Sequence, residues 1–112
     1  MNIEKDNLLE LFKEKVNDSL YPLKMGGRIN ENAFNELLLI AEEATRLLKD
    51  DDLVPKKLLL EIYLVSVGVD SENIRIKSGF LSSISSRLLD CFNFIIDGET
   101  IDNKKDNKPR II

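Results

Sequence analysis

The stretch from Ser71 to Ile96 constrains the fold most strongly, because its apolar side chains recur at helical spacing. They fall seven, three, four, three and four residues apart, at Ile74, Leu81, Ile84, Leu88, Cys91 and Ile95. On an α-helix this spacing gives one continuous apolar seam. Further apolar residues widen the seam on its two sides: Phe80, Leu89, Phe92, Phe94 and Ile96. We therefore predict one long helix from Ser71 to Ile96, packed at the centre of an all-α bundle.

Gly79 is the weak point of this helix, because a glycine inside a helix costs roughly 0.5 to 1 kcal/mol relative to alanine. Two helices that meet at Gly79 are therefore the alternative. Gly98 is expected to end the helix. The polar residues after it predict an extended or mobile tail. We thus expect a helical bundle domain over residues 1–98 and a polar C-terminal tail over residues 99–112.

Three amphipathic segments precede the central one, which makes about four helices in total. The first, from Glu4 to Leu20, is expected to close at Tyr21-Pro22, since proline cannot continue a helix and restricts the residue before it. Asn30 is a suitable cap for the second segment, which is expected to run to about Lys49.

The third segment is expected to begin with Pro55 in its first turn and to stop at Gly68. Side chains branched at Cβ gather between Ile62 and Val69, so a buried strand is the alternative there. Glu61 lies within the same apolar run. We expect its carboxylate at the solvated rim of a helix, and a buried carboxylate of the kind that active sites use is the alternative.

The composition excludes several classes of protein. The chain has 112 residues, which fits one domain. Its formal net charge of -4 makes nucleic acid and anionic membranes poor primary partners, because both favour lysine and arginine. A basic protein is the natural complement. Cys91 is the sole cysteine, so we expect a buried thiol in a reducing compartment and no disulfide within the chain.

The N-terminal residues predict where the protein resides. The charged segment from Met1 to Asn7 lacks the apolar core of a signal peptide. In addition, no apolar run approaches the roughly 20 residues of a membrane span. We therefore expect a cytoplasmic protein that does not enter membranes.

The side chains that most enzymes use are missing. The sequence contains no histidine, which removes the commonest general base and the commonest zinc and iron ligand. Gly26-Gly27-Arg28 could suggest an anion-holding loop, but the lysine and hydroxyl of a phosphate loop are absent, so we interpret it as a flexible turn. We expect a protein that is not an enzyme and that needs no cofactor or metal.

The strongest local bias in charge lies between Glu31 and Asp52, where the sequence contains seven acidic residues and only two basic ones. Three acids recur every seven residues and form a row beside the inner side of the second helix, and a leucine lies between two of them on the outer side. Together with the acidic loop that follows, they form the predicted partner-binding surface: Glu36, Leu39, Glu43, Asp50, Asp51 and Asp52. The alternative is an ordinary solvated helix, with Glu43 and Arg46 paired three residues apart.

The C-terminal end carries a resemblance to a known family. The segment Phe92-Asn-Phe-Ile-Ile-Asp-Gly-Glu99, followed by Lys108-Pro-Arg-Ile-Ile112, resembles the closing part of small acidic bacterial immunity proteins. These proteins neutralise toxins of contact-dependent or polymorphic systems, which are delivered between neighbouring cells. The resemblance covers the last fifth of the chain. It implies a cytoplasmic inhibitor that plugs the nucleic-acid-binding or catalytic cleft of a cationic toxin, with a nuclease favoured.

Two other classes of function stay open. Ile74 to Gly79 followed by Phe80 to Leu88 can be written as a DNA-binding helix-turn-helix. Against it, Ser85 falls where an apolar residue is wanted, and the domain is acidic. The second alternative is a structural protein whose central helix pairs with a copy of itself, because its apolar arc is wide for three short partners. A homodimer is compatible with an inhibitor as well.

Overall fold

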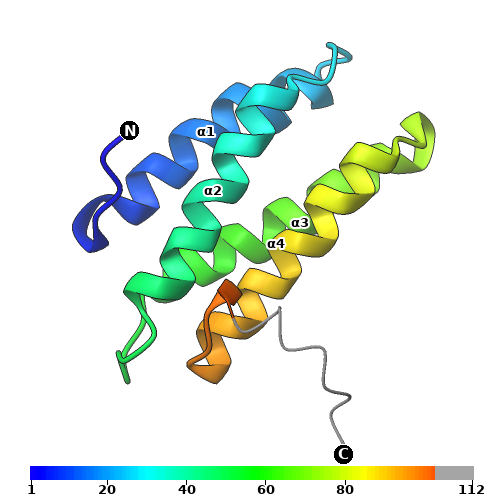
Figure 1. Ribbon diagram of the computed structural model, residues 1–112. Coiled ribbons are helices and arrows are strands. Elements are labelled where there is room, and N and C mark those ends of the chain that lie inside the picture. The colour runs from blue at the N-terminus through cyan, green and yellow to red at the C-terminus, as the bar shows by residue number, and fades with distance from the viewer. Residues whose placement is uncertain (103–112) are drawn as a thin grey trace, which may run out of the picture.

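The protein folds into four α-helices, which the computed structural model describes over residues 1–102 (Figure 1). A short 3-10 turn, η1 (Lys5–Asn7), leads into α1 (Leu8–Lys24), α2 (Glu31–Leu47), α3 (Lys56–Ile76) and α4 (Gly79–Asp97). No strand occurs within these residues. The predicted all-α fold is therefore confirmed, and the alternative of a strand from Ile62 to Val69 is wrong, because that segment lies inside α3.

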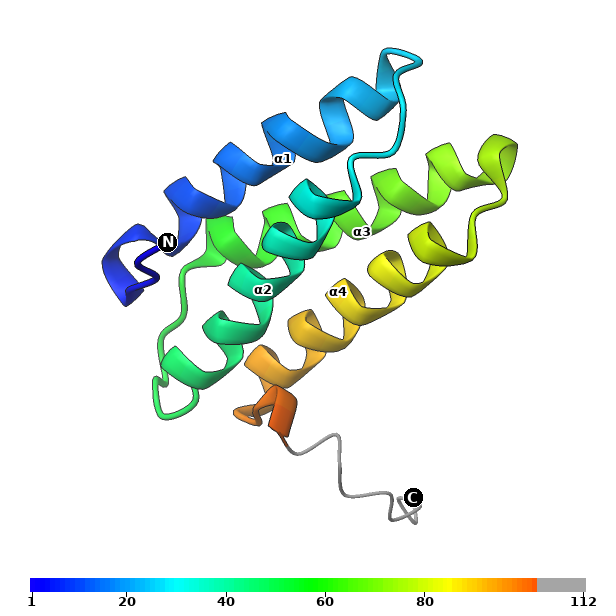
Figure 2. The same ribbon diagram turned by 45° about the horizontal axis from the view of Figure 1, so that its top comes forward.

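The helices form two antiparallel hairpins that pack against each other. Helix α1 pairs with α2, and α3 pairs with α4; α1 then lies against α3, and α2 lies against α4 (Figure 2). Each helix thus occupies one corner of the bundle. The last helix is not central as predicted, because it packs mainly against α2 and α3.

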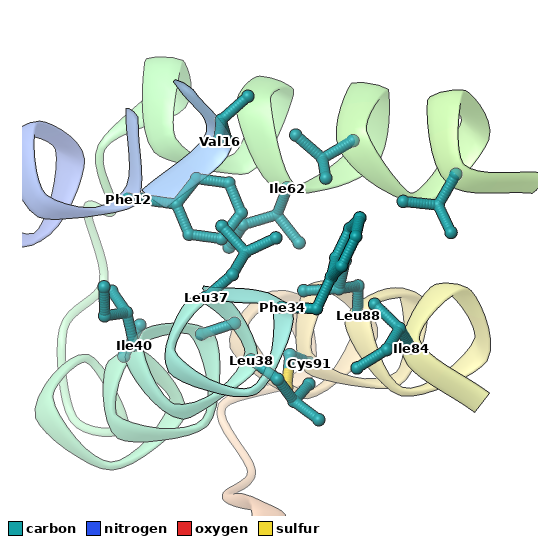
Figure 3. Packing of buried hydrophobic residues seen from close by; sticks show 14 of the residues in the cluster. Phe12, Val16, Phe34, Leu37, Leu38, Ile40, Ile62, Ile84, Leu88 and Cys91 are labelled. Carbon is teal, nitrogen blue, oxygen red and sulfur yellow. The ribbon is translucent and has the colours of Figure 1, made fainter. Parts of the chain in front are cut away.

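One hydrophobic core joins the four helices. Phe12 of α1, Phe34 and Leu37 of α2, Ile62 of α3 and Leu88 of α4 converge in it, and all five are fully buried (Figure 3). The predicted seam of α4 lies in this core, with buried side chains at Leu81, Ile84, Leu88, Cys91 and Ile95. The burial of the thiol is therefore confirmed.

The predicted long helix from Ser71 to Ile96 is wrong, because the chain turns between α3 and α4. Lys77 adopts the left-handed conformation, with φ of 59°, and ends α3. Ser78 then caps α4, since its hydroxyl accepts a hydrogen bond from the amide of Leu81 at 3.3 Å. The alternative of two helices is thus correct, with Gly79 as the first residue of the second one. Ile74 belongs to α3 and is 77% exposed.

Gly68 does not stop the third helix, which continues to Ile76. A Cβ atom at this position would lie 3.0 Å from Cδ2 of Leu20. The glycine therefore lets α1 and α3 approach each other closely. Glu61 in the same helix is partly exposed, as expected for a residue at the rim.

Pro22 does not end the first helix, which runs on to Lys24. Proline removes one helical hydrogen bond, but its fixed φ is compatible with the last turn. Leu23 is 1% exposed, so this turn is held in the core by its own side chain. Burial of Leu23 therefore outweighs the local preference to stop.

The boundaries of α2 and the C-terminal end of α4 follow the prediction. The side chain of Asn30 caps α2 by accepting a hydrogen bond from the amide of Ala33 at 3.1 Å. Gly98 ends α4 with φ of 71°. Residues 99–102 then fold back onto α2, because the amide of Ile101 donates to Oγ1 of Thr45 at 3.0 Å and Thr100 is buried. The bundle thus extends past Gly98, and the rest of the predicted tail lies outside the described residues.

Candidate functional site

The outer side of α2 presents one large apolar side chain to solvent. Ala33, Leu37, Ile40 and Ala44 point into the core and are buried, whereas Leu39 is 47% exposed. The helical repeat that buries the first four residues turns Leu39 away from them. We call Glu36, Leu39, Glu43, Asp50, Asp51 and Asp52 the α2 surface.

Glu36 lies on the side of α2 that faces α1. Its Oε2 atom forms an ion pair with Nζ of Lys15 at 2.9 Å, and the same ammonium lies 3.8 Å from Oδ2 of Asp18. The side chain of Lys15 is 18% exposed and that of Glu36 is 34% exposed, so this pair is only partly shielded from water. The hydrogen bond with Glu36 raises the pKa of Lys15 above its ordinary value. Glu36 therefore ties α1 to α2 as well as lying on the α2 surface.

Glu43 belongs to a second group of charges at the C-terminal half of α2. Arg46 lies 3.0 Å from Glu43, as expected from their spacing, and its Nε lies 3.2 Å from Asp102. Hydrogen bonds to Asp102 and then to Glu43 raise the pKa of Arg46. The neighbouring Glu42 pairs with Arg87 of α4 at 3.1 Å. The charge of Glu43 is thus balanced locally.

The acidic loop after α2 differs from the helix. Asp51 pairs with Lys5 of η1 at 3.1 Å. Asp50 and Asp52 are exposed, and neither forms an ion pair with another residue in the range 1–102. The least neutralised charge of the α2 surface therefore lies in this loop.

A shallow hollow adjoins Glu36 between α1 and α2. Its volume is about 380 Å³, and its lining is mainly polar: Lys15, Asn17, Asp18, Pro22, Asn30, Asn32, Ala33 and Glu36. Neither this hollow nor the cations that pair with Glu36, Glu42 and Asp51 were predicted from the sequence. No sequence signal could have identified them, because each depends on a contact between segments far apart in the chain.

The segment proposed as a helix-turn-helix has a different geometry. Helices α3 and α4 lie side by side, since the rings of Tyr63 and Phe92 are 5.6 Å apart and the hydroxyl of Ser66 donates to the carbonyl of Ser85 at 2.9 Å (Figure 2). The two helices of a DNA-binding helix-turn-helix cross at about 90 to 120°. Ser85 is buried, and its hydroxyl donates to Asp70 at 2.5 Å. The α3–α4 hairpin therefore does not match that motif.

Neither metal ligands nor membrane spans mark a second kind of site. Across residues 1–102, no three acidic or cysteine side chains converge in a group that could hold a metal ion. Within the same range, every helix is too short or too polar to cross a bilayer.

No protein-family model, no curated protein and no solved structure matches this chain.

Proposed function

We propose that this protein is a non-catalytic inhibitor that binds a basic protein partner through the α2 surface, in the way that an immunity protein blocks a cationic toxin. A nuclease is the favoured class of toxin, because a nuclease cleft is basic and complements an acidic surface. The observation that carries the proposal is the exposed Leu39 between Glu36 and Glu43 on α2. The acidic loop that follows α2 adds Asp50 and Asp52, which form no ion pair with the described residues.

The apolar part of this surface supports an anchoring role for Leu39. An isolated exposed leucine is common on protein surfaces. Here, however, it lies between Glu36 and Glu43, whose side chains are both about one-third exposed. Apolar side chains surrounded by polar groups are typical of interface positions from which water is excluded on binding. Leu39 would thus supply affinity.

The charged part of the surface supports a steering role for the loop. Glu36, Glu43 and Asp51 each have a cation of their own chain within 3.1 Å, which lowers the field that they project. Asp50 and Asp52 have none in the described part of the chain, so they contribute most to attraction over a distance. Attraction of this kind raises association rates and weakens with salt.

Co-purification of the chain with the products of adjacent genes is the first experiment, because the partner is unidentified. Association rates for a captured partner are then measured for Asp50→Lys/Asp52→Lys at low and at physiological salt. We expect a rate at least about tenfold lower at low salt, with a smaller difference at high salt. Leu39→Ala is expected to accelerate dissociation and to cost more than about 1 kcal/mol of affinity.

Matched charge reversals on another part of the bundle serve as the control. Glu14 in the middle of α1 and Glu31 at the start of α2 are exposed, and Glu14→Lys/Glu31→Lys changes the net charge by the same amount. This variant is expected to bind nearly as well as the parent chain. Equal losses in both charge variants, or unchanged binding at low salt in Asp50→Lys/Asp52→Lys, would exclude the acidic loop as part of the docking surface.

A further inference from the structure

The two helices of the second hairpin expose a group of large apolar side chains on the side away from the core. On α3, Leu60, Tyr63, Leu64 and Val67 are all at least 45% exposed. On α4, Leu89 and Ile96 are exposed, and they lie three residues before and four residues after Phe92. We call the six exposed residues the α3–α4 apolar surface: Leu60, Tyr63, Leu64, Val67, Leu89 and Ile96.

This surface is continuous across the two helices. The ring of Phe92 packs against that of Tyr63, with 5.6 Å between the ring centroids. Residues three and four positions from Phe92 share its side of the helix, so Leu89 and Ile96 flank the contact with α3. Contiguous exposed apolar surface of this kind marks an interaction site more often than scattered single residues do. All six residues are at least 39% exposed in the described bundle, and Leu64 at the edge of the surface also lines a hollow with Leu20 and Tyr21 of α1.

The residues of α3 that border the surface have opposite charges at its two ends. Lys56, Tyr63 and Asp70 are spaced seven residues apart and so lie on one side of the helix, with Tyr63 in the middle. Asp70 is exposed, and its Oδ1 also accepts the hydrogen bond from Ser85 within the hairpin. Leu60 and Val67 form a parallel row beside them, with Ile74 one further heptad along. The pattern therefore reads as basic, then apolar, then acidic along the direction of α3.

This charge order allows two copies of α3 to pair when they run in opposite directions. If two copies of α3 pack antiparallel about a twofold axis near Tyr63 and Leu64, the Lys56 end of one copy meets the Asp70 end of the other. Leu60 of each copy then comes close to Val67 of the other. In a twofold interface each such contact occurs twice, so the arrangement yields two ion pairs around one apolar centre.

We propose that the α3–α4 apolar surface binds a second copy of this chain, with the two α3 helices antiparallel. No residue of this interface belongs to the α2 surface. The sequence suggested a dimer through the apolar seam of residues 71–96. The proposed dimer differs, because the seam residues of α4 are buried in the core of the bundle.

The mass of the full chain in solution is the first test. Sedimentation equilibrium from about 1 µM to about 1 mM is expected to show a rise from monomer to dimer. Leu60→Glu/Val67→Glu is expected to remain monomeric over this range. Leu39→Glu places the same change on an exposed leucine of α2 and is expected to dimerise as the parent does. Circular dichroism checks that each variant is folded.

Exchange of the two charges tests the antiparallel order. Lys56→Glu and Asp70→Lys each place like charges together and are expected to raise the dimer dissociation constant at least about tenfold at low salt. The double variant Lys56→Glu/Asp70→Lys restores opposite charges and is expected to recover the dimer. A chain that stays monomeric at about 1 mM, a dimer unaffected by Leu60→Glu/Val67→Glu, or a double variant no better than the single ones would overturn the proposal.

Discussion

The side chain of Asn73 makes two hydrogen bonds with the backbone of Ser78, across the turn between α3 and α4. Its Oδ1 accepts from the Ser78 amide at 2.7 Å, and its Nδ2 donates to the Ser78 carbonyl at 3.0 Å. The same Nδ2 also lies 3.1 Å from the hydroxyl of Ser82. One side chain thus fixes both the exit from α3 and the entry into α4.

Replacing Asn73 by alanine is expected to lower the free energy of unfolding by about 1 to 2 kcal/mol, because the hydrogen bonds across the turn are lost. Urea denaturation followed by circular dichroism measures this change. Asn35→Ala on α2 is the control, since it gives a similar gain in helix propensity at an exposed position. Equal stability of the two variants would contradict the proposed role of Asn73.

Lys77 holds a left-handed conformation that costs a residue with a Cβ atom about 1 to 2 kcal/mol. Lys77→Gly is therefore expected to be more stable than Lys77→Ala by about 0.5 to 1 kcal/mol, and both variants lose the same charge. Gly98→Ala makes the opposite change at φ of 71° and is expected to lose about 1 kcal/mol. Thermal unfolding of the three variants measures both effects, and a Lys77→Gly variant no more stable than Lys77→Ala would contradict them.

Gly68 and Gly79 are both helical, but their surroundings differ. A Cβ atom at Gly79 would meet no atom within 4 Å, so Gly79→Ala is expected to stabilise the protein by about 0.5 to 1 kcal/mol. At Gly68 the added atom would press against the buried Leu20, and this contact offsets the gain in helix propensity. We expect Gly68→Ala to be the less stable of the two in urea denaturation. If Gly68→Ala is instead the more stable variant, the close approach of α1 and α3 does not require a glycine at position 68.

The ion pair between Lys15 and Glu36 gives a stability that depends on pH. Because the folded-state pKa of Lys15 is raised above the ordinary value of about 10.4, the contribution is complete below that value and is lost as pH rises through the folded-state pKa. Lys15→Gln is expected to reduce the free energy of unfolding by up to about 1 kcal/mol at pH 7, and the difference from the parent should shrink above pH of about 10.4.

The control for this prediction is Lys13→Gln, an exposed lysine on the same helix. It forms no ion pair in the described part of the chain, so its replacement is expected to change stability by less than about 0.5 kcal/mol. A difference between Lys15→Gln and the parent that stays constant from neutral to alkaline pH would show that packing of the lysine stem, and not its charge, is responsible.

Much of the fold could be predicted from periodicity and caps. Asn30 caps the start of α2 and Gly98 ends α4, as predicted, because each effect depends only on neighbours three or four residues away. The errors at Pro22 and Gly68 share one cause. Each residue favours the end of a helix locally. Burial of Leu23 continues α1 past Pro22, and close packing against Leu20 places Gly68 inside α3. Tertiary contacts of this kind leave no mark on the local pattern.

The position of the turn between α3 and α4 was harder to find. The seam appeared continuous because the spacing from Ile74 to Leu81 fits a helix, although Ile74 points to solvent in α3. The signals were present in Asn73 and Ser78, but a lysine in the left-handed conformation is unusual and cannot be recognised from its identity. For the α2 surface, position on the helix was predictable, whereas the cations that pair with Glu36 and Asp51 depend on how the hairpins pack.

The thiol of Cys91 is fully buried in the wall of α4 that faces the core. A modifying reagent can reach it when the bundle opens, and no second cysteine competes for the reagent. The natural sequence therefore carries its own reporter of breathing motions. The rate of its alkylation, followed as denaturant is added, gives the free energy of the openings that expose α4, provided that reclosing is faster than alkylation.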